Sequence, residues 1–183
     1  MEPLLEPGAK DNPASAVPWM FGGHVEPVRL PWTWALERLT QARNYWIATT
    51  RPDGRPHSRP VWGIWLRTAC YFSTGSLAAS NILTNPAITL HLESGNEVVI
   101  LEGVAAMVNT SELLQEIVKL YNQKYHENID PDQLPGPFYA VAPQTAFGWL
   151  VDPSGLDGGA IFHGTATRWR FQQGLFPTHE AEQ

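Results

Sequence analysis

The feature that most constrains the fold of this chain is a turn, Arg-Pro-Asp-Gly at 51–54, set between two β-rich runs. Proline presets φ at its position, aspartate tolerates turn geometry, and glycine supplies a positive φ at little cost. The flanking runs at 45–50 and 55–65 therefore predict a β-hairpin. Pro56 and Pro60 have no N–H to donate to a ladder, so the second strand must contain an irregular segment or an exposed edge.

Further β-rich runs, separated by short turn signals, make up much of the remaining chain. They lie at 70–74, 87–93, 97–108, 138–143, 145–151 and 165–171. Strands that follow one another at such short spacing are typical of an antiparallel barrel.

Three segments predict helices beside these strands: 33–43, 76–84 and 109–125. Thr33 is the expected N-cap of the first helix. Asn109 and Glu112 have the spacing of a capping box at the start of the third. The Gly-rich segment 152–164 is expected to be a loop. The predicted class is mainly β with α, an antiparallel barrel of about six to seven strands with about three helices.

Composition limits the chain to one folded domain with extensions. Its 183 residues suit a single domain, and a hydrophobic share of 43% is enough for a substantial core. Residues 1–31 are rich in proline and show little periodicity, which predicts an extended N-terminal arm. The barrel domain is expected to span 32–173, followed by a tail at 174–183.

Charge and residue counts argue against several function classes. The formal net charge is −6 without a basic tract, so we expect neither a nucleic-acid nor a membrane partner. Cys70 is the single cysteine, and it lies in a strand-like run typical of a core. No pair among the six histidines has the spacing of a local metal site, so no metal is expected. The start of the chain has neither a basic segment nor a long apolar run, and the default expectation is a cytoplasmic protein.

The segment Ser73-Thr74-Gly75-Ser76, where a strand ends and a helix begins, is the first candidate site. A helix N-terminus carries roughly half a positive charge and free N–H groups, and hydroxyls add donors for a phosphate. Yet the chain from Ser73 to Leu83 contains no Lys or Arg. Composition alone explains the segment more simply, with Ser76 or Thr74 as a helix cap.

The second candidate site is the strand segment from His57 to Gly63, which is interrupted by proline and carries Arg59 and Trp62. Such a strand could present backbone N–H groups along the edge of a flat ring. Composition alone explains it more simply as an ordinary edge strand with solvated polar residues.

Taken in order, these segments resemble the pyridoxamine 5'-phosphate oxidase-like, flavin- and deazaflavin-binding split β-barrel proteins. The resemblance runs from about Trp34 to Phe171. The segments that carry it are RNYWIATTRPDGRPHSRPVWGIW (43–65), YFSTGS (71–76), SNILTNPAITLHLESGNEVVILEGVA (80–105), YNQKY (121–125), YAVAPQTAFGW (139–149) and TATRWRF (165–171).

The resemblance implies a split β-barrel that forms a homodimer, with two cofactor sites at the interface. The implied cofactor is FMN or, alternatively, the deazaflavin coenzyme F-420. By motif position, the implied site residues are Arg59, Pro60, Val61 and Trp62 along the isoalloxazine ring; Ser73, Thr74, Ser76 and Asn81 at the ribityl phosphate; and Trp149 and Arg168 from the second subunit. The implied activity is hydride transfer between this cofactor and a small organic substrate, with no catalytic residue assigned.

One departure from the family pattern bears on this expectation. Family members commonly carry Lys or Arg in the helix after the phosphate segment, where this chain has Leu77, Ala78 and Ser80. Three explanations remain open: a cation supplied from elsewhere, by Arg51, Arg55, Arg59 or Arg168 of a partner chain; a cofactor with a different phosphate placement; or a barrel that no longer binds flavin. The alternative functions are a binding or carrier barrel for a planar ligand and a degenerate structural member.

Overall fold

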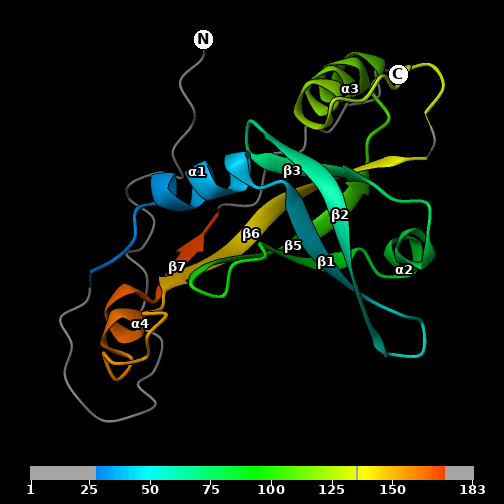
Figure 1. The fold of residues 1–183 in the computed structure, drawn as a ribbon. Coiled ribbons are helices and arrows are strands. Elements are labelled where there is room, and N and C mark those ends of the chain that lie inside the picture. The colour runs from blue at the N-terminus through cyan, green and yellow to red at the C-terminus, as the bar shows by residue number, and fades with distance from the viewer. Residues whose placement is uncertain (1–27, 135, 172–183) are drawn as a thin grey trace.

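In the part of the chain that the structure describes, seven strands form one antiparallel sheet that closes on itself (Figure 1). The computed structural model describes residues 28–134 and 136–171. The strands are β1 (Asn44–Thr50), β2 (Pro56–Leu66), β3 (Ala69–Ser73), β4 (Ala87–His91), β5 (Glu97–Met107), β6 (Phe138–Leu150) and β7 (Thr167–Arg170). Their order is β3-β2-β1-β4-β5-β6-β7, and a β3–β6 pairing closes the first six into a barrel, with β7 outside it. The predicted barrel of six to seven antiparallel strands is confirmed.

Four helices accompany the sheet in the described residues, one more than expected. They are α1 (Trp32–Gln41), α2 (Leu77–Thr84), α3 (Ser111–Tyr125) and α4 (Ala160–Thr165). The unexpected helix, α4, forms inside the predicted Gly-rich loop because the Asp157 carboxylate accepts the backbone N–H groups of Gly159 and Ile161. Within the described ranges, no helix is long and apolar enough to cross a membrane. The predicted arm and tail lie mostly on residues 1–27 and 172–183, outside the described residues.

Two predicted helix caps are wrong. Helix α1 already includes Trp32, so Thr33 lies inside the helix and Pro31 occupies the N-cap. Thr110, not Asn109, is the N-cap of α3, and its side chain makes no capping bond. Packing of the apolar faces against the barrel therefore sets these two starts more than side-chain capping does.

The two strands expected at 138–143 and 145–151 are one continuous strand, β6. Its pairing with β5 shifts register between Glu102 and Gly103, where Gly103 faces Pro143 and Glu102 faces Thr145. The extra residue on β6 forms a β-bulge, which lets a proline sit within a long strand. A Cβ atom at Gly103 would lie only 2.4 Å from the Ala142 carbonyl oxygen, so glycine is required there.

Alternate residues of the strands fill the barrel interior. Tyr45, Ile47, Leu90 and Leu101 are fully buried, as is Cys70, which agrees with its expected place in the core. This alternation follows from the two-residue period of a strand. Burial raises the pKa of the Cys70 thiol, so the group stays protonated within the core.

One edge of β2 is left open over half of its length. Within the described part of the chain, residues 56–62 pair with β1 alone, whereas residues 63–66 also pair with β3. The expected edge-exposed segment is therefore present.

Gly63 marks the point where the open part of β2 ends, and helix α3 holds it in place. The Gly63 N–H donates to the Tyr125 hydroxyl at 2.8 Å, and Lys124 Nζ donates to the Gly63 carbonyl at 2.9 Å. The Tyr125 hydroxyl also lies 2.7 Å from the carbonyl oxygen of Arg43. The C-terminal turn of α3 thus fixes the backbone at one end of the open edge.

Candidate functional site

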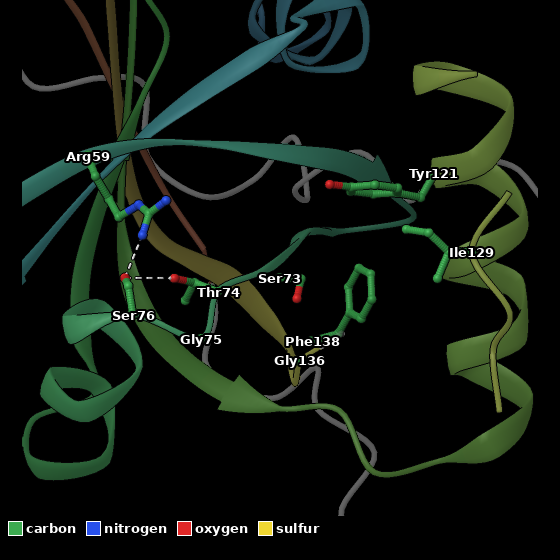
Figure 2. A pocket seen from close by; sticks show the side chains of 9 residues that line it. All are labelled: Arg59, Ser73, Thr74, Gly75, Ser76, Tyr121, Ile129, Gly136 and Phe138. Atoms are coloured by element: carbon green, nitrogen blue, oxygen red, sulfur yellow. Dashed lines mark hydrogen bonds between the residues drawn. The ribbon is translucent and has the colours of Figure 1, made fainter. Parts of the chain in front are cut away.

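An open pocket of about 410 Å³ lies between the open part of β2, the start of α2 and helix α3 (Figure 2). Its lining residues are Arg59, Ser73, Thr74, Gly75, Ser76, Tyr121, Ile129, Gly136 and Phe138. Polar groups gather at the Arg59 side and aromatic groups at the Tyr121 side (Figure 2). The pocket therefore has two chemically different ends.

The polar end is organised around the hydroxyl of Ser76. Arg59 Nη1 donates to Ser76 Oγ at 2.5 Å, and Thr74 Oγ1 lies 3.2 Å from the same oxygen. Ser76 is the N-cap of α2, and its Oγ accepts the Ala78 N–H at 3.3 Å. A guanidinium, two hydroxyls and a helix N-terminus thus meet at one point. We call this arrangement, with Ser73 and Gly75, the cradle.

The sequence explains why these groups meet. Ser76 has extended backbone angles and a side chain that accepts an N–H bond, as preferred at a helix N-cap. Arg59 lies in the open part of β2, on the same strand face as the buried Val61. At Gly75 a Cβ atom would meet nothing within 4 Å, so the cradle is open to solvent there. This donor set is chemically suited to an anion such as a phosphate.

The opposite end is an aromatic wall formed by Tyr121, Ile129 and Phe138. The Tyr121 and Phe138 rings meet edge to face with centroids 5.7 Å apart. The Tyr121 hydroxyl points into the pocket, towards Arg59 (Figure 2), and makes no hydrogen bond within the described chain. Burial, with a smaller contribution from the Glu127 carboxylate, raises the pKa of Tyr121, so its hydroxyl keeps its proton.

Four of the predicted site residues line this pocket: Arg59, Ser73, Thr74 and Ser76. The Ser73 hydroxyl donates to the Pro137 carbonyl at 3.1 Å, which ties the cradle to the start of β6. These residues come from two sequence segments that were predicted separately, and the fold brings both to one place.

The other predicted residues of β2 lie beside the pocket but do not line it. Pro60 is exposed and has no N–H, and Val61 is buried in the core. Trp62 stacks on Tyr125 with ring centroids 4.6 Å apart and lies 6.2 Å from the Tyr121 ring. Trp62 therefore borders the aromatic end through Tyr121.

Asn81, predicted at the phosphate, lies outside the pocket lining and is fully buried. Its Nδ2 donates to Thr49 Oγ1 at 2.9 Å, while its Oδ1 has no hydrogen-bond partner among the described residues. Through this bond Asn81 joins α2 to β1. In this chain its contacts are those of a residue that anchors the helix below the cradle.

Trp149 and Arg168, predicted to come from a second subunit, do not line the pocket of their own chain. Trp149 lies on β6 and meets Phe162 of α4 edge to face at 5.8 Å. Arg168 lies on β7, opposite Phe147. Whether a partner chain brings them to the site stays a prediction.

The aromatic wall was not predicted as part of the site. Tyr121 belongs to the apolar stripe of α3, which looks like ordinary core packing, and Phe138 opens a strand. Ile129 lies in a proline-rich loop with no local motif. The segment YNQKY at 121–125, which carries part of the family resemblance, is the one signal that could have pointed to this helix.

The positions where the family commonly has cations have different environments here. Ala78 is fully buried in the core, whereas 43% of Leu77 is exposed and Ser80 is exposed. Among the described residues that line the pocket, Arg59 is the one charged group. No cluster of three or more potential metal ligands occurs in residues 28–134 and 136–171.

Comparison with solved structures gives many similar folds. Conserved hypothetical protein Rv2991 from Mycobacterium tuberculosis is 21% identical, with a TM-score of 0.61 over 71% of this chain and 90% of that one. HutZ, the heme storage protein from Vibrio cholerae, is 20% identical, with a TM-score of 0.55 over 63% and 93% of the two chains. A FAD-binding protein from Mesorhizobium loti is 14% identical, with a TM-score of 0.50 over 64% and 92%. At these identities the likenesses establish the fold alone.

A comparison with protein families gives a more specific result. None of the curated proteins matches the chain. The family model described as pyridoxamine 5'-phosphate oxidase matches residues 35–172, which span the barrel, the cradle and the aromatic wall. This match confirms the predicted resemblance: the chain belongs to the pyridoxamine 5'-phosphate oxidase family.

Proposed function

We propose that this protein is a homodimeric oxidoreductase. In this proposal it binds FMN, or alternatively coenzyme F-420, at the pocket described above and transfers a hydride between this cofactor and a small organic substrate. The observation that carries the proposal is the contact between Arg59 and Ser76. It supplies a guanidinium to the cradle although α2 has no Lys or Arg. Of the three explanations for the missing helix cation, this contact favours the first.

The residues present fit the phosphate of such a cofactor. A phosphate monoester needs a cation and several N–H or O–H donors, and the cradle offers Arg59, the hydroxyls of Thr74 and Ser76, and the N-terminus of α2. The bound cofactor would supply the redox chemistry. The chain would hold its phosphate at the cradle and place its ring along the open edge of β2.

The backbone of β2 would also offer hydrogen-bonding groups to the cofactor ring. Successive residues of β2 direct their N–H groups to opposite edges of the strand. The N–H of Gly63 is directed to the β1 side, where it donates to the Tyr125 hydroxyl, which in turn bonds to the Arg43 carbonyl. Trp62 therefore presents its N–H and carbonyl at the open edge, where they can bond to a flat heteroaromatic ring. Pro60 on the same edge has no N–H and offers its carbonyl alone.

A homodimer is supported by the outer face of the sheet. One row of paired residues runs across four strands: Trp46, His91, Ile100 and Phe147. All four are partly exposed in the single chain, and Trp46 stacks on His91 with their rings nearly parallel. Outward residues of an antiparallel sheet that faces water are usually polar, so a row that is apolar except for His91 suits coverage by a second copy.

A test of the dimer uses Ile100→Glu, which places a charge in this row. Sedimentation velocity should give a dimer for the unchanged protein and a monomer for the variant. Leu83→Glu, at a residue that is 78% exposed on α2, serves as the control and should leave the dimer intact. A monomeric unchanged protein would refute this part of the proposal.

The cofactor is tested by titrating the protein with FMN, riboflavin and coenzyme F-420. Riboflavin lacks the phosphate, so the pair FMN and riboflavin isolates the cradle. Arg59→Ala should weaken FMN about 10- to 100-fold, because a hydrogen bond to a charged group contributes about 1.5–3 kcal/mol. Riboflavin affinity should not change. Arg55→Ala is the matched control, since Arg55 lies directly before the same strand but pairs with Asp53 outside the pocket.

Two outcomes would count against the proposal. Equal FMN affinity in the Arg59→Ala variant would reject the cradle as the phosphate site. No binding of either cofactor by the unchanged protein would reject the flavin function altogether. Binding without turnover of any reduced cofactor would instead favour the carrier function.

A further inference from the structure

The aromatic wall of Tyr121, Ile129 and Phe138 offers no charged group to a phosphate. We infer that this wall is a substrate subsite for an uncharged, apolar group with one hydrogen-bond-accepting oxygen, which the Tyr121 hydroxyl orients. The inference rests on the proposed function, in which the cofactor phosphate occupies the cradle. It assigns the protein a substrate without a phosphate group, unlike the phosphorylated substrate in the name of its family.

The charges around the pocket disfavour a second phosphate. Arg59 is the one cation among the described lining residues, and it lies at the cradle. The charged group that acts on Tyr121 is the Glu127 carboxylate, which is negative. A phosphate at the aromatic wall would lose its water without gaining a cation and would lie near this carboxylate, which is unfavourable on both counts.

The Tyr121 hydroxyl is the polar group that the wall offers to a neutral ligand. It makes no hydrogen bond within the described chain and points into the pocket (Figure 2). Because it keeps its proton, it donates, and a carbonyl or ether oxygen is a fitting acceptor. The neighbouring Tyr125 is different, since its hydroxyl is already engaged with Gly63 and Arg43.

The remaining surface of the wall is apolar and shaped by rings. The Tyr121 and Phe138 rings stand at 90° to each other, and the Ile129 side chain lies beside them (Figure 2). Such a corner favours an aromatic or aliphatic group over a hydrated one. Selectivity for an oxygen acceptor would then come from a single hydroxyl, Tyr121.

Three matched probes test the subsite on the cofactor-loaded protein: 2-acetylnaphthalene, 2-ethylnaphthalene and 2-naphthyl phosphate. Binding is followed by the change in absorbance of the bound flavin. We expect 2-acetylnaphthalene to bind about tenfold more tightly than 2-ethylnaphthalene, because only its carbonyl accepts the Tyr121 hydrogen bond. Tyr121→Phe should remove this difference while leaving 2-ethylnaphthalene unchanged. The phosphate probe should bind at least tenfold more weakly than the ketone.

Two variants of Ile129 complete the test. Ile129→Trp fills the corner and should weaken both neutral probes. Ile129→Arg adds a cation and should make 2-naphthyl phosphate the best of the three ligands. Release of the flavin by the neutral probes would overturn the inference, because the wall would then belong to the cofactor ring. Equal affinity for the ketone and the phosphate, or no effect of Tyr121→Phe, would also overturn it.

Failure of the proposed function can be told apart from failure of this inference. If no cofactor binds, the same probes are tested on the cofactor-free protein by thermal shift. A stabilisation by 2-acetylnaphthalene that Tyr121→Phe removes would keep the subsite and reject the flavin function. No stabilisation by either neutral probe would reject the subsite.

Discussion

Replacing Tyr125 by phenylalanine tests how helix α3 holds the open edge of β2. The ring remains, so its stack on Trp62 is preserved, but the hydroxyl is lost. That hydroxyl accepts the N–H of Gly63, which is buried. An unsatisfied buried donor costs about 1–3 kcal/mol, whereas the Gly63 carbonyl keeps its bond from Lys124.

We therefore expect Tyr125→Phe to lower the free energy of unfolding by about 2 kcal/mol. For a chain of this size the melting temperature should fall by about 4–8 °C. Urea unfolding at fixed protein concentration measures the effect, with Tyr121→Phe as the matched control. Tyr121 lies one helical turn away and its hydroxyl makes no hydrogen bond in the described chain, so the control should stay within about 0.5 kcal/mol. Equal stability of the two variants would show that α3 does not anchor Gly63.

Two further predictions concern the core and the effect of pH. Gly148→Ala would place a Cβ atom 2.8–2.9 Å from the rings of Trp169 and Trp34, so urea unfolding should show a loss of about 1–3 kcal/mol. An unchanged midpoint would mean that these rings can move aside. Burial raises the pKa of Tyr125 to about 12, above its usual value of 10. The folded state then holds this proton more tightly than the unfolded state. The contribution of the Tyr125 hydroxyl to the free energy of unfolding is therefore fully present below pH 10 and is lost as the pH rises towards 12. Urea midpoints between pH 9 and 12 should fall more steeply for the unchanged protein than for Tyr125→Phe. The same pH dependence in both proteins would contradict the raised pKa of Tyr125.

The sequence predicts the barrel well because its signals are local. The turn at 51–54 and the alternation of apolar residues each specify a strand or hairpin without reference to the remainder of the chain. Helix α4 was not predicted because the Gly-rich segment around it has a low helix propensity, which two backbone N–H bonds to the Asp157 carboxylate offset. The continuity of β6 was not predicted either, because it depends on pairing with a distant strand, β5, with a register shift between Glu102 and Gly103.

The site was predicted only in part, for a related reason. Arg59 and Ser76 were both proposed, but their direct contact is a property of the closed barrel and not of either segment. Tyr121 could not be told from a core residue, since its spacing on α3 is that of any buried stripe. Asn81, in contrast, was predicted at the cofactor phosphate from its motif position, but its side chain donates to Thr49.

The open edge of β2 also bears on how the protein avoids aggregation. An unpaired strand edge is a template on which another chain can add a strand. Pro56 and Pro60 lie within the segment that pairs with β1 alone, and neither has an N–H to offer. Since both occupy even-numbered positions with Ser58 and Trp62, two of the four N–H positions along that edge have no donor. The prolines therefore leave carbonyls available to a flat ligand while denying an incoming strand the regular ladder it would need.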